Sequence, residues 1–244
     1  MEKSVLIIGA TSDVARATAH LFAKKGYELV LMARNEDKVV AISNDITIRY
    51  GVSCTPVVMD ILSFEDHKPL IDNMGNLPFL TICFVGYLGD QELAEKRIDM
   101  TRAIIDANYT GPVSLLNAIA NRYEKQSKGY IIGISSVAGD RGRLSNYTYG
   151  SAKAGFTAYL SGLRNRLFHK GVHVVTVKPG FMDTQMTAGM DLPKLLTIKP
   201  AEAAQSIYRI AQSKKNTVYL SWKWRYIMLI IKIIPEAIFK RLKL

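Results

Sequence analysis

A tyrosine and a lysine four residues apart, Tyr149 and Lys153, could form a proton-transfer pair. At this spacing the two side chains lie one turn apart on one face of a helix. A free tyrosine has a pKa of about 10, and a neighbouring ammonium group favours its phenolate and lowers that value. Such a pair could hand a proton to a carbonyl oxygen near neutral pH. Chance matches to this spacing are common, so its meaning depends on a cofactor site being built around it.

Apolar segments alternate with helical segments along most of the chain, which predicts a Rossmann-type doubly wound parallel sheet. In this fold we expect about seven strands in the order 3-2-1-4-5-6-7, within a single domain. The predicted strands cover residues 5–8, 27–32, 53–59, 79–85, 130–134, 172–177 and 217–220. The predicted helices run from the turn at 9–13 to about residue 25, and over 36–50, 64–73, 91–107, 111–127, 148–170 and 201–213.

The composition is that of a folded globular protein with an uneven basic charge. The 244 residues are 48% hydrophobic and 22% charged, and the net charge is +11. No metal-ligand spacing and no nucleic-acid recognition motif is present, so we expect neither a metal nor a nucleic-acid partner. The start of the chain does not resemble a signal peptide, and we expect a cytoplasmic protein. In the predicted strand order Cys54 and Cys83 lie too far apart to form a disulfide.

The turn after the first strand occupies the place where such a sheet binds its ligand. Backbone N–H groups at the start of the following helix can hold a pyrophosphate. The glycine-rich fingerprint is incomplete, because Asp13 and Ala15 stand where two further glycines are expected. Asp13 would repel phosphate unless its side chain turns away as a helix cap. An ordinary strand–helix turn is the alternative interpretation.

The end of the second strand favours NADP(H) over NAD(H). An acid there would accept the ribose hydroxyls of NAD, whereas a 2′-phosphate requires a cation. The strand ends in Arg34 and Asn35, and the first acid is Glu36, already in the helix. The planar guanidinium of Arg34 can clamp a phosphate. A solvated arginine at a helix start is the alternative.

Ser136, Tyr149 and Lys153 give the sequence a resemblance to the short-chain dehydrogenase/reductase family, over roughly residues 3–220. Ser136 precedes Tyr149 by 13 residues, the usual spacing of that family. The resemblance implies that Tyr149 is the general acid, Ser136 binds the carbonyl and Lys153 tunes the tyrosine. It implies that Asn108 supports a water that relays the proton. The implied cofactor-binding residues are Gly9, Thr11, Ser12, Asp13, Val14, Arg34, Asp60, Gly86, Tyr149, Lys153, Pro179, Gly180, Met182 and Thr184.

Two departures from the family pattern resemble one branch of it, the polyprenyl-phosphoryl ketopentose reductases. The usual Asn-Asn-Ala-Gly after the fourth strand is Cys83-Phe84-Val85-Gly86 here, and the glycine turn is altered. That branch also carries a basic, apolar C-terminal tail. The resemblance therefore implies a lipid-linked ketosugar as a candidate substrate, while the residues that would shape its pocket, 139–147 and 184–198, follow no readable code.

The last 23 residues form a basic amphipathic tail, so we divide the chain into a catalytic domain (1–221) and a tail (222–244). The tail carries a net charge of +5, from Lys223, Arg225, Lys232, Lys240, Arg241, Lys243 and Glu236. Its apolar segment is interrupted by Lys232 and Pro235 and is far shorter than the roughly 20 residues of a spanning helix. Aromatic residues and flanking cations suit a segment lying in the membrane interface. Packing on the chain's own domain or across a dimer is the alternative.

These features predict an NADP(H)-dependent oxidoreductase that reduces a ketone or oxidises a secondary alcohol. We expect a homodimer or homotetramer, with peripheral contact to the inner face of the membrane as a further hypothesis. A second reading is a reductase of a soluble, fatty or steroid-like ketone with the tail as a lid. A third is a non-catalytic dinucleotide sensor or scaffold, which the altered glycine turn favours and the Ser136–Tyr149–Lys153 set opposes.

Overall fold

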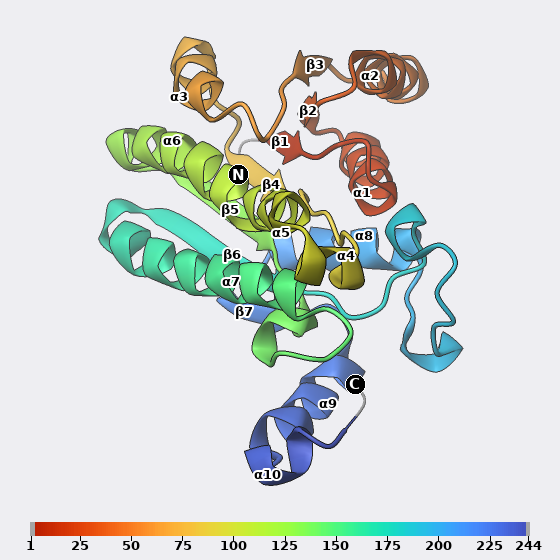
Figure 1. Ribbon diagram of the computed structural model, residues 1–244. Helices are drawn as coiled ribbons and strands as arrows, with labels where there is room; N and C mark the ends of the chain where they lie inside the picture. The colour runs from red at the N-terminus through yellow and green to blue at the C-terminus, as the bar shows by residue number, and fades with distance from the viewer. Residues whose placement is uncertain (1–2, 243–244) are drawn as a thin grey trace.

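A seven-stranded, wholly parallel sheet forms the centre of the computed structural model, which describes residues 3–242 (Figure 1). Its strand order, β3-β2-β1-β4-β5-β6-β7, confirms the prediction. Since every strand runs in the same direction, all carboxyl ends meet at one edge of the sheet. The strands are β1 (Ser4–Ile8), β2 (Glu28–Ala33), β3 (Cys54–Val58), β4 (Leu80–Cys83), β5 (Gly129–Ile134), β6 (Val172–Lys178) and β7 (Thr217–Tyr219).

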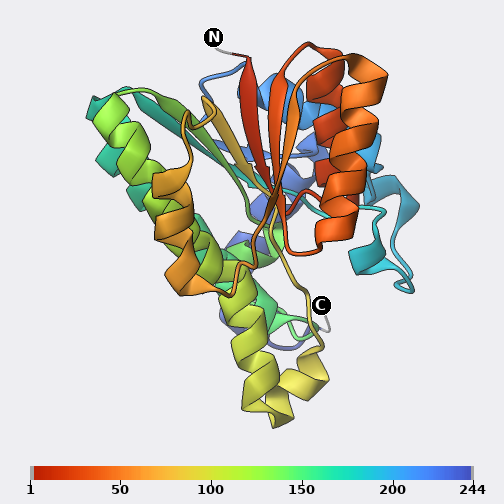
Figure 2. The ribbon, with the colours of Figure 1, turned by 90° about the horizontal axis from the view of Figure 1, so that it is seen from above.

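Helices cover both faces of the sheet, which gives three layers (Figure 2). Three helices pack on one face: α1 (Asp13–Lys24), α2 (Glu36–Tyr50) and α8 (Pro200–Ala211). Three helices pack on the other: α3 (Phe64–Asn73), α6 (Gly111–Gln126) and α7 (Tyr147–Leu167). This arrangement is the predicted doubly wound fold.

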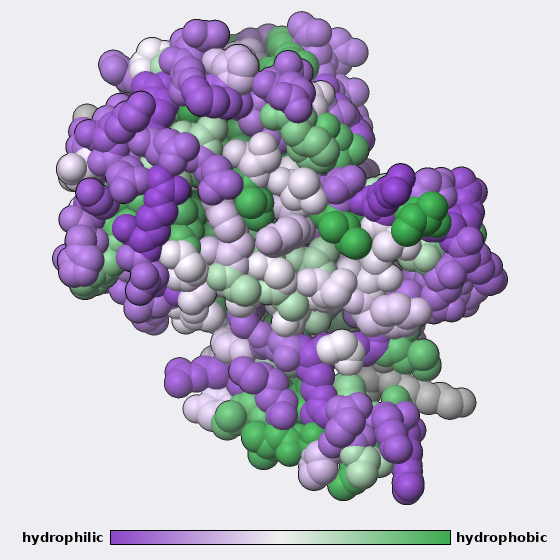
Figure 3. All heavy atoms as spheres, turned by 60° about the vertical axis from the view of Figure 1, so that its left-hand side comes forward, coloured by the Kyte–Doolittle hydropathy of each residue, from purple (hydrophilic) through white to green (hydrophobic). Residues whose placement is uncertain are grey.

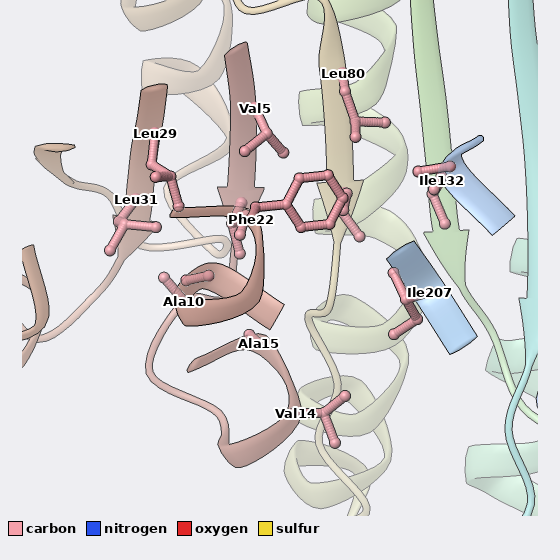
Figure 4. Close-up of a cluster of buried hydrophobic side chains, with 14 of the residues drawn as sticks. Val5, Ala10, Val14, Ala15, Phe22, Leu29, Leu31, Leu80, Ile132 and Ile207 are labelled. Carbon is pink, nitrogen blue, oxygen red and sulfur yellow. The ribbon is translucent and has the colours of Figure 1, made fainter. Parts of the chain in front are cut away.

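The central strand β1 sends alternate side chains into two separate cores. Val5 and Ile7 pack with Phe22 of α1 in one cluster, part of which Figure 4 shows, and Leu6 and Ile8 enter the cluster on the opposite face. Successive residues of a strand point to opposite faces. A strand buried on both faces needs apolar residues at every position, which explains the unbroken run at 5–8.

The helix predicted over 91–107 is wrong in one respect, because the segment is broken. Helix α4 (Gln91–Lys96) ends and α5 (Ile98–Ile105) begins at Arg97, whose backbone is extended with φ −133°. A π-helical turn (Asp106–Thr110) then joins α5 to α6. Single π-helical turns are rare and frequently lie at functional sites. This one carries Asn108, which is fully buried.

Within residues 3–242, four 3₁₀ turns lie in the loops, at Val137–Asp140, Phe168–Lys170, Gln185–Thr187 and Lys194–Leu196. The second of these accounts for the predicted helix 148–170, whose last residues tighten into 3₁₀ geometry after α7. Gly171 then takes φ +69° and ends the segment. Three of the four turns lie on loops at the carboxyl edge of the sheet, after β5 and β6.

The tail forms two helices, α9 (Trp222–Ile233) and α10 (Glu236–Phe239), at one end of the molecule (Figure 1). Trp224 and Met228 of α9 are buried in a small cluster with Val137, and Phe181 packs against it. None of the helices within residues 3–242 is long and apolar enough to cross a membrane.

Cys54 lies on β3 and Cys83 on β4, with two strands between them. Both thiols are free, which confirms the predicted absence of a disulfide.

Candidate active site

The turn after β1 is held close to the segment that follows β4. Gly9 has φ +78°, and a Cβ atom there would lie 3.2 Å from the backbone nitrogen of Val85. A residue with a side chain would therefore be strained and would push the two loops apart. Ser12 caps α1, accepting a hydrogen bond from the Ala15 N–H at 3.4 Å. The helix N-terminus thus opens at the carboxyl edge, where the partial positive charge of a helix can hold an anion.

Asp13, the acid in place of a glycine, turns its carboxylate toward another loop. Its Oδ2 accepts a hydrogen bond from the Gln185 N–H at 2.9 Å, and its Oδ1 lies 3.5 Å from Arg16. The acid therefore joins the cofactor turn to the loop after β6. The side chain of Val14 is buried in the core, so its backbone is what a ligand could reach, while Thr11 is half-buried in the turn itself.

Arg34 and Asp60 follow β2 and β3 at the same edge. Arg34 is exposed, and within residues 3–242 no hydrogen bond or ion pair occupies its guanidinium. Asp60 is half-buried, and its Oδ1 accepts a hydrogen bond from the Leu62 N–H at 3.0 Å, which shapes the turn after β3. A free guanidinium at the end of β2 suits the phosphate-binding role predicted for Arg34.

Lys153 lies at the centre of the site, with a side chain that is 2% exposed. Its ammonium donates hydrogen bonds to the carbonyl of Val85 at 3.1 Å and to that of Ile134 at 3.3 Å. Ile134 is the last residue of β5, and Val85 lies two residues beyond the end of the neighbouring strand β4. A Cβ atom on Gly86 would lie 3.4 Å from the Lys153 Nζ, so the glycine leaves the space beside the ammonium open.

Asn108 fixes the same segment from the other side. Its Nδ2 donates to the carbonyls of Tyr87 at 2.6 Å and Ile104 at 2.8 Å, and its Oδ1 accepts from the Tyr87 N–H at 3.1 Å. The Oδ1 would lie 3.3 Å from a Cβ atom on Gly86. An amide has two donors and two acceptor lone pairs, so one lone pair of Asn108 remains for a water or ligand beside Gly86.

Ser136 and Tyr149 meet where the turn after β5 packs on α7. The Ser136 Oγ accepts a hydrogen bond from the Ala138 N–H at 3.1 Å, and Ser136 lies near enough to the Tyr149 hydroxyl to lower its pKa. Gly150 permits this approach, because a Cβ atom there would lie 2.8 Å from the Ala138 carbonyl. The Lys153 Nζ lies 5.9 Å from the centre of the Tyr149 ring. Three of the four predicted catalytic residues are thus neighbours, and Asn108 joins them through Gly86.

Burial shifts the pKa values of this pair in opposite directions. It raises the pKa of Tyr149 to about 12, which the hydrogen bond with Ser136 opposes, and it lowers the pKa of Lys153 to about 8. The prediction that Lys153 lowers the pKa of Tyr149 is wrong for this structure, because the ammonium donates its hydrogen bonds to backbone carbonyls and burial raises the tyrosine pKa. At neutral pH the Tyr149 hydroxyl therefore keeps its proton, as a proton donor requires.

The loop after β6 brings the remaining predicted residues to the edge. The Pro179 carbonyl accepts a hydrogen bond from the Val137 N–H at 3.0 Å, which ties this loop to the serine turn. Gly180 lies directly against the tail, since a Cβ atom there would be 1.9 Å from the Trp224 Nε1. Met182 pairs with Ile198 in an isolated parallel bridge that closes the loop on itself.

Thr184 caps the 3₁₀ turn that lies over Gly86. Its N–H donates to the Thr187 Oγ1 at 3.3 Å in a capping box. Within that turn, the Met186 Cε would be 3.7 Å from a Cβ atom on Gly86. The loop therefore reaches the space beside Lys153 and Asn108.

Three residues that shape this edge were not predicted: Gln185, Met186 and Trp224. Gln185 contributes only its backbone N–H, which no side-chain pattern reveals. Met186 lies in a loop without a readable motif. Trp224 belongs to the amphipathic pattern of the tail, which shows two apolar faces and does not say which one is buried.

A nicotinamide dinucleotide fits these residues. Gly9 and Gly86 lack side chains where a Cβ atom would crowd the two loops or the ammonium. The N-terminus of α1 and the exposed Arg34 could receive the phosphates. Within residues 3–242, no group of three or more His, Cys, Asp or Glu side chains is arranged to hold a metal ion.

The comparisons with known proteins agree with this geometry. The sequence model described as short chain dehydrogenase matches residues 3–194. An uncharacterized oxidoreductase of Mycobacterium tuberculosis is 31% identical over 242 residues, which are 98% of this chain and 96% of that one. The chain therefore belongs to the short-chain dehydrogenase family and is an NAD(P)-dependent oxidoreductase.

Solved structures share the fold at lower identity. A short-chain dehydrogenase from Sphingobium yanoikuyae in complex with NADPH has a TM-score of 0.83 at 22% identity, over 96% of this chain and 97% of that one. An NAD⁺-bound xylitol dehydrogenase has a TM-score of 0.76 at 19% identity, over 89% and 97% of the two chains. These likenesses confirm the fold, and the two proteins differ in the cofactor they contain.

We expect Lys153→Met to stabilise the cofactor-free protein at pH 7. Because the folded pKa, about 8, lies below the ordinary value of 10.5, the unfolded chain binds more protons between these pH values. Wild-type stability therefore rises with pH across this window. Below about pH 8 burial of the ammonium costs on the order of 3 kcal/mol of folding free energy. The variant regains this cost but loses the hydrogen bonds to the two carbonyls, so the net stabilisation is smaller. Urea unfolding at pH 7 and at about pH 9.5 measures the difference, which should shrink at the higher pH.

Lys214→Met provides the control, because Lys214 is exposed and the change should have little effect at either pH. A Lys153→Met protein that is less stable than wild type at pH 7, or a difference that is the same at both values, would contradict burial as the cause of the shift.

Proposed function

We propose that this protein reduces a ketone to a secondary alcohol with NADP(H), and that Tyr149 is the general acid. The observation that carries the proposal is the approach of Ser136 to the Tyr149 hydroxyl, one helical turn from the buried Lys153 ammonium. When bound, the cofactor supplies the hydride that forms the new C–H bond at the carbonyl carbon. The Tyr149 hydroxyl gives its proton to the carbonyl oxygen, so the products are the alcohol and a phenolate that must be reprotonated. The reverse reaction oxidises a secondary alcohol.

Ser136 stabilises the negative charge that grows on the carbonyl oxygen. Its Oγ already accepts a hydrogen bond from the Ala138 N–H at 3.1 Å, which leaves its own hydrogen available as a donor. The interaction of Ser136 with the Tyr149 hydroxyl opposes the rise in the pKa of Tyr149, as expected if Ser136 donates to the tyrosine oxygen. When a substrate carbonyl arrives, Ser136 and Tyr149 can both donate to its oxygen. A fixed pair of donors acts most strongly in the transition state.

Lys153 and Asn108 return a proton to Tyr149. An ammonium has three donors, and two of those of Lys153 are taken by the Val85 and Ile134 carbonyls. The third can bind a ribose hydroxyl or a water. A pKa of about 8 lets Lys153 release and regain a proton near neutral pH. The free lone pair of the Asn108 amide can hold the relay water beside it.

The cofactor that we favour is NADP(H), on the ground that Arg34 is exposed and unpaired among residues 3–242. Gly9, Thr11, Ser12, Asp13 and Val14 would form the pyrophosphate turn. Asp60 would meet the adenine, and the nicotinamide would lie near Gly86, Pro179, Gly180, Met182 and Thr184. Asp13 would act there indirectly, through its hydrogen bond to Gln185.

The substrate that we propose is a lipid-linked ketosugar of the polyprenyl-phosphoryl ketopentose type. Its support is the altered Cys83–Gly86 segment and the basic, apolar tail at 222–244, which we propose contacts the membrane peripherally. We place the protein in the cytoplasm, at the inner face, as a homodimer or homotetramer. A soluble or fatty ketone with the tail as a lid is the second candidate, supported by the contact of Trp224 with the loop at Gly180.

Tyr149→Phe is expected to lower turnover by about 10² to 10⁴-fold, the usual contribution of a positioned general acid. The change removes the hydroxyl and keeps the ring, so NADPH binding and the unfolding temperature should remain close to those of wild type. Steady-state NADPH oxidation and NADPH fluorescence titration measure the two effects separately.

Tyr159→Phe is the matched control on the same helix, where the hydroxyl donates a hydrogen bond to the Asn117 Oδ1 at 2.9 Å on the surface side. It should retain full turnover. A Tyr149→Phe protein that keeps its rate would remove the proposed acid.

Arg34→Ala is expected to raise the KM for NADPH by about 10-fold or more and to leave the KM for NADH nearly unchanged. A hydrogen bond to a charged group contributes about 1.5–3 kcal/mol, and only NADPH carries the 2′-phosphate. The KM for NADPH of Arg34→Lys should lie between those of the wild-type and Arg34→Ala proteins, because lysine keeps the charge but lacks the planar guanidinium that binds a phosphate with two hydrogen bonds. Equal effects on both cofactors would contradict a role in their discrimination.

A further inference from the structure

Helix α9 has two apolar faces, and the protein covers only one of them. Trp224 and Met228 are buried against the body of the protein. The opposite face is 58–70% exposed, and its members follow helical spacings of 4, 3, 1 and 3 residues, which place them on one stripe. That stripe, here called the outer face, consists of Trp222, Tyr226, Leu229, Ile230 and Ile233. Figure 3 shows apolar side chains beside hydrophilic ones over this lower end of the molecule.

The inner face of α9 holds loops that surround the proposed substrate position. The Trp224 indole lies against Gly180, packs edge-to-face on Phe181 at 5.0 Å, and donates from Nε1 to the Leu196 carbonyl at 3.1 Å. Lys223 donates to the Leu195 carbonyl at 2.8 Å. One turn of the helix therefore fixes both the loop after β6 and the 3₁₀ turn at 194–196.

The last turn of α9 is bound to the segment that follows Ser136. The Arg141 guanidinium donates to the Ile231 and Ile234 carbonyls, both at 2.6 Å, and pairs with Glu236 at 2.8 Å. It also lies 3.6 Å from the centre of the Phe239 ring. The carbonyls at the end of the helix thus find a cation, which stabilises the helix in its docked position.

The charge around the outer face identifies its partner as an anionic bilayer. The exposed cations Arg225 and Lys232 lie beside the stripe, and Lys240 and Arg241 follow α10. The acidic Glu236 is already paired with Arg141. A second copy would bring this basic surface against another basic surface. An anionic bilayer offers the opposite charge together with an apolar layer for the aromatic and aliphatic side chains.

We propose that an anionic bilayer, by covering the outer face, holds α9 in its docked position and thereby orders the loops on its inner face. Loops with few buried contacts open easily, and a ligand that binds only the docked state shifts the population toward it. This inference rests on the proposed function, since these loops surround the proposed ketone site. The bilayer is then an activator of the site as well as the place where a lipid-linked substrate is found.

Hydrogen exchange of the full-length protein tests the coupling without depending on turnover. We expect vesicles of phosphatidylglycerol at low salt to slow exchange at 179–182 and 194–198, as well as in α9, by at least about fivefold. Vesicles of phosphatidylcholine should have little effect. Protection of α9 alone, or no binding to the anionic vesicles, would overturn the proposal.

Two variants separate the steps of this coupling. Leu229→Glu with Ile233→Glu should abolish vesicle binding and the added protection, whereas Ile48→Glu, a matched change at an 86% exposed site on α2, should abolish neither. Trp224→Phe should still bind vesicles but lose most of the protection at 194–198, because it lacks the donor to Leu196. Retained protection in that variant would contradict transmission through the indole.

Turnover of a water-soluble ketone, measured in the same samples, distinguishes this inference from the proposed function. Anionic vesicles should raise kcat/KM about fivefold or more in the wild-type protein, and each variant is compared with its own rate without vesicles. Ordered loops without any turnover would contradict the proposed reaction and leave the coupling standing. If the protein binds the vesicles but its kcat/KM does not change, the coupling is contradicted and the proposed reaction is not.

Discussion

The whole site depends on one buried ammonium group. Lys153 is 2% exposed, and its Nζ donates to the Val85 carbonyl, just beyond β4, at 3.1 Å and to the Ile134 carbonyl, at the end of β5, at 3.3 Å. A charge in such a position is costly unless polar groups surround it, so the chain must supply them. It does so by bringing the segments after β4 and β5 to α7. Around the ammonium lie Gly86, Asn108 and the turn that contains Ser136.

Much of this was predictable because it follows from local patterns. The unbroken apolar segment at 5–8 and the alternation of strands with helices predicted a doubly wound parallel sheet, and the structure has the strand order usual for that fold. The family resemblance at Ser136, Tyr149 and Lys153 predicted that these residues lie together. The π-helical turn at 106–110 was missed, since it depends on packing rather than propensity. The partner of Asp13 lies 172 residues further along the chain. The pKa of Tyr149 moved in the unexpected direction, because its burial was not visible in the sequence.

The tail shows why a pattern alone does not reveal a role. Its sequence supported either membrane contact or packing on the domain, and α9 has the geometry for both at once. Trp224 and Met228 are buried while the outer face is open to a partner. Removing residues 222–244 would remove Trp224 and Met228 from the cluster that contains Val137, the residue after Ser136. Point changes on the outer face are therefore the cleaner test of a membrane role.

The central claim is that this site transfers a hydride to a carbonyl carbon and a proton to its oxygen. The most direct measurement is NADPH oxidation by the full-length protein with a panel of ketones, including a lipid-linked ketosugar, together with quantification of the alcohol formed. We expect one alcohol for each NADPH consumed with at least one member of the panel. Tight NADPH binding without oxidation by any ketone, or without alcohol formation, would contradict the account and favour a dinucleotide sensor or scaffold.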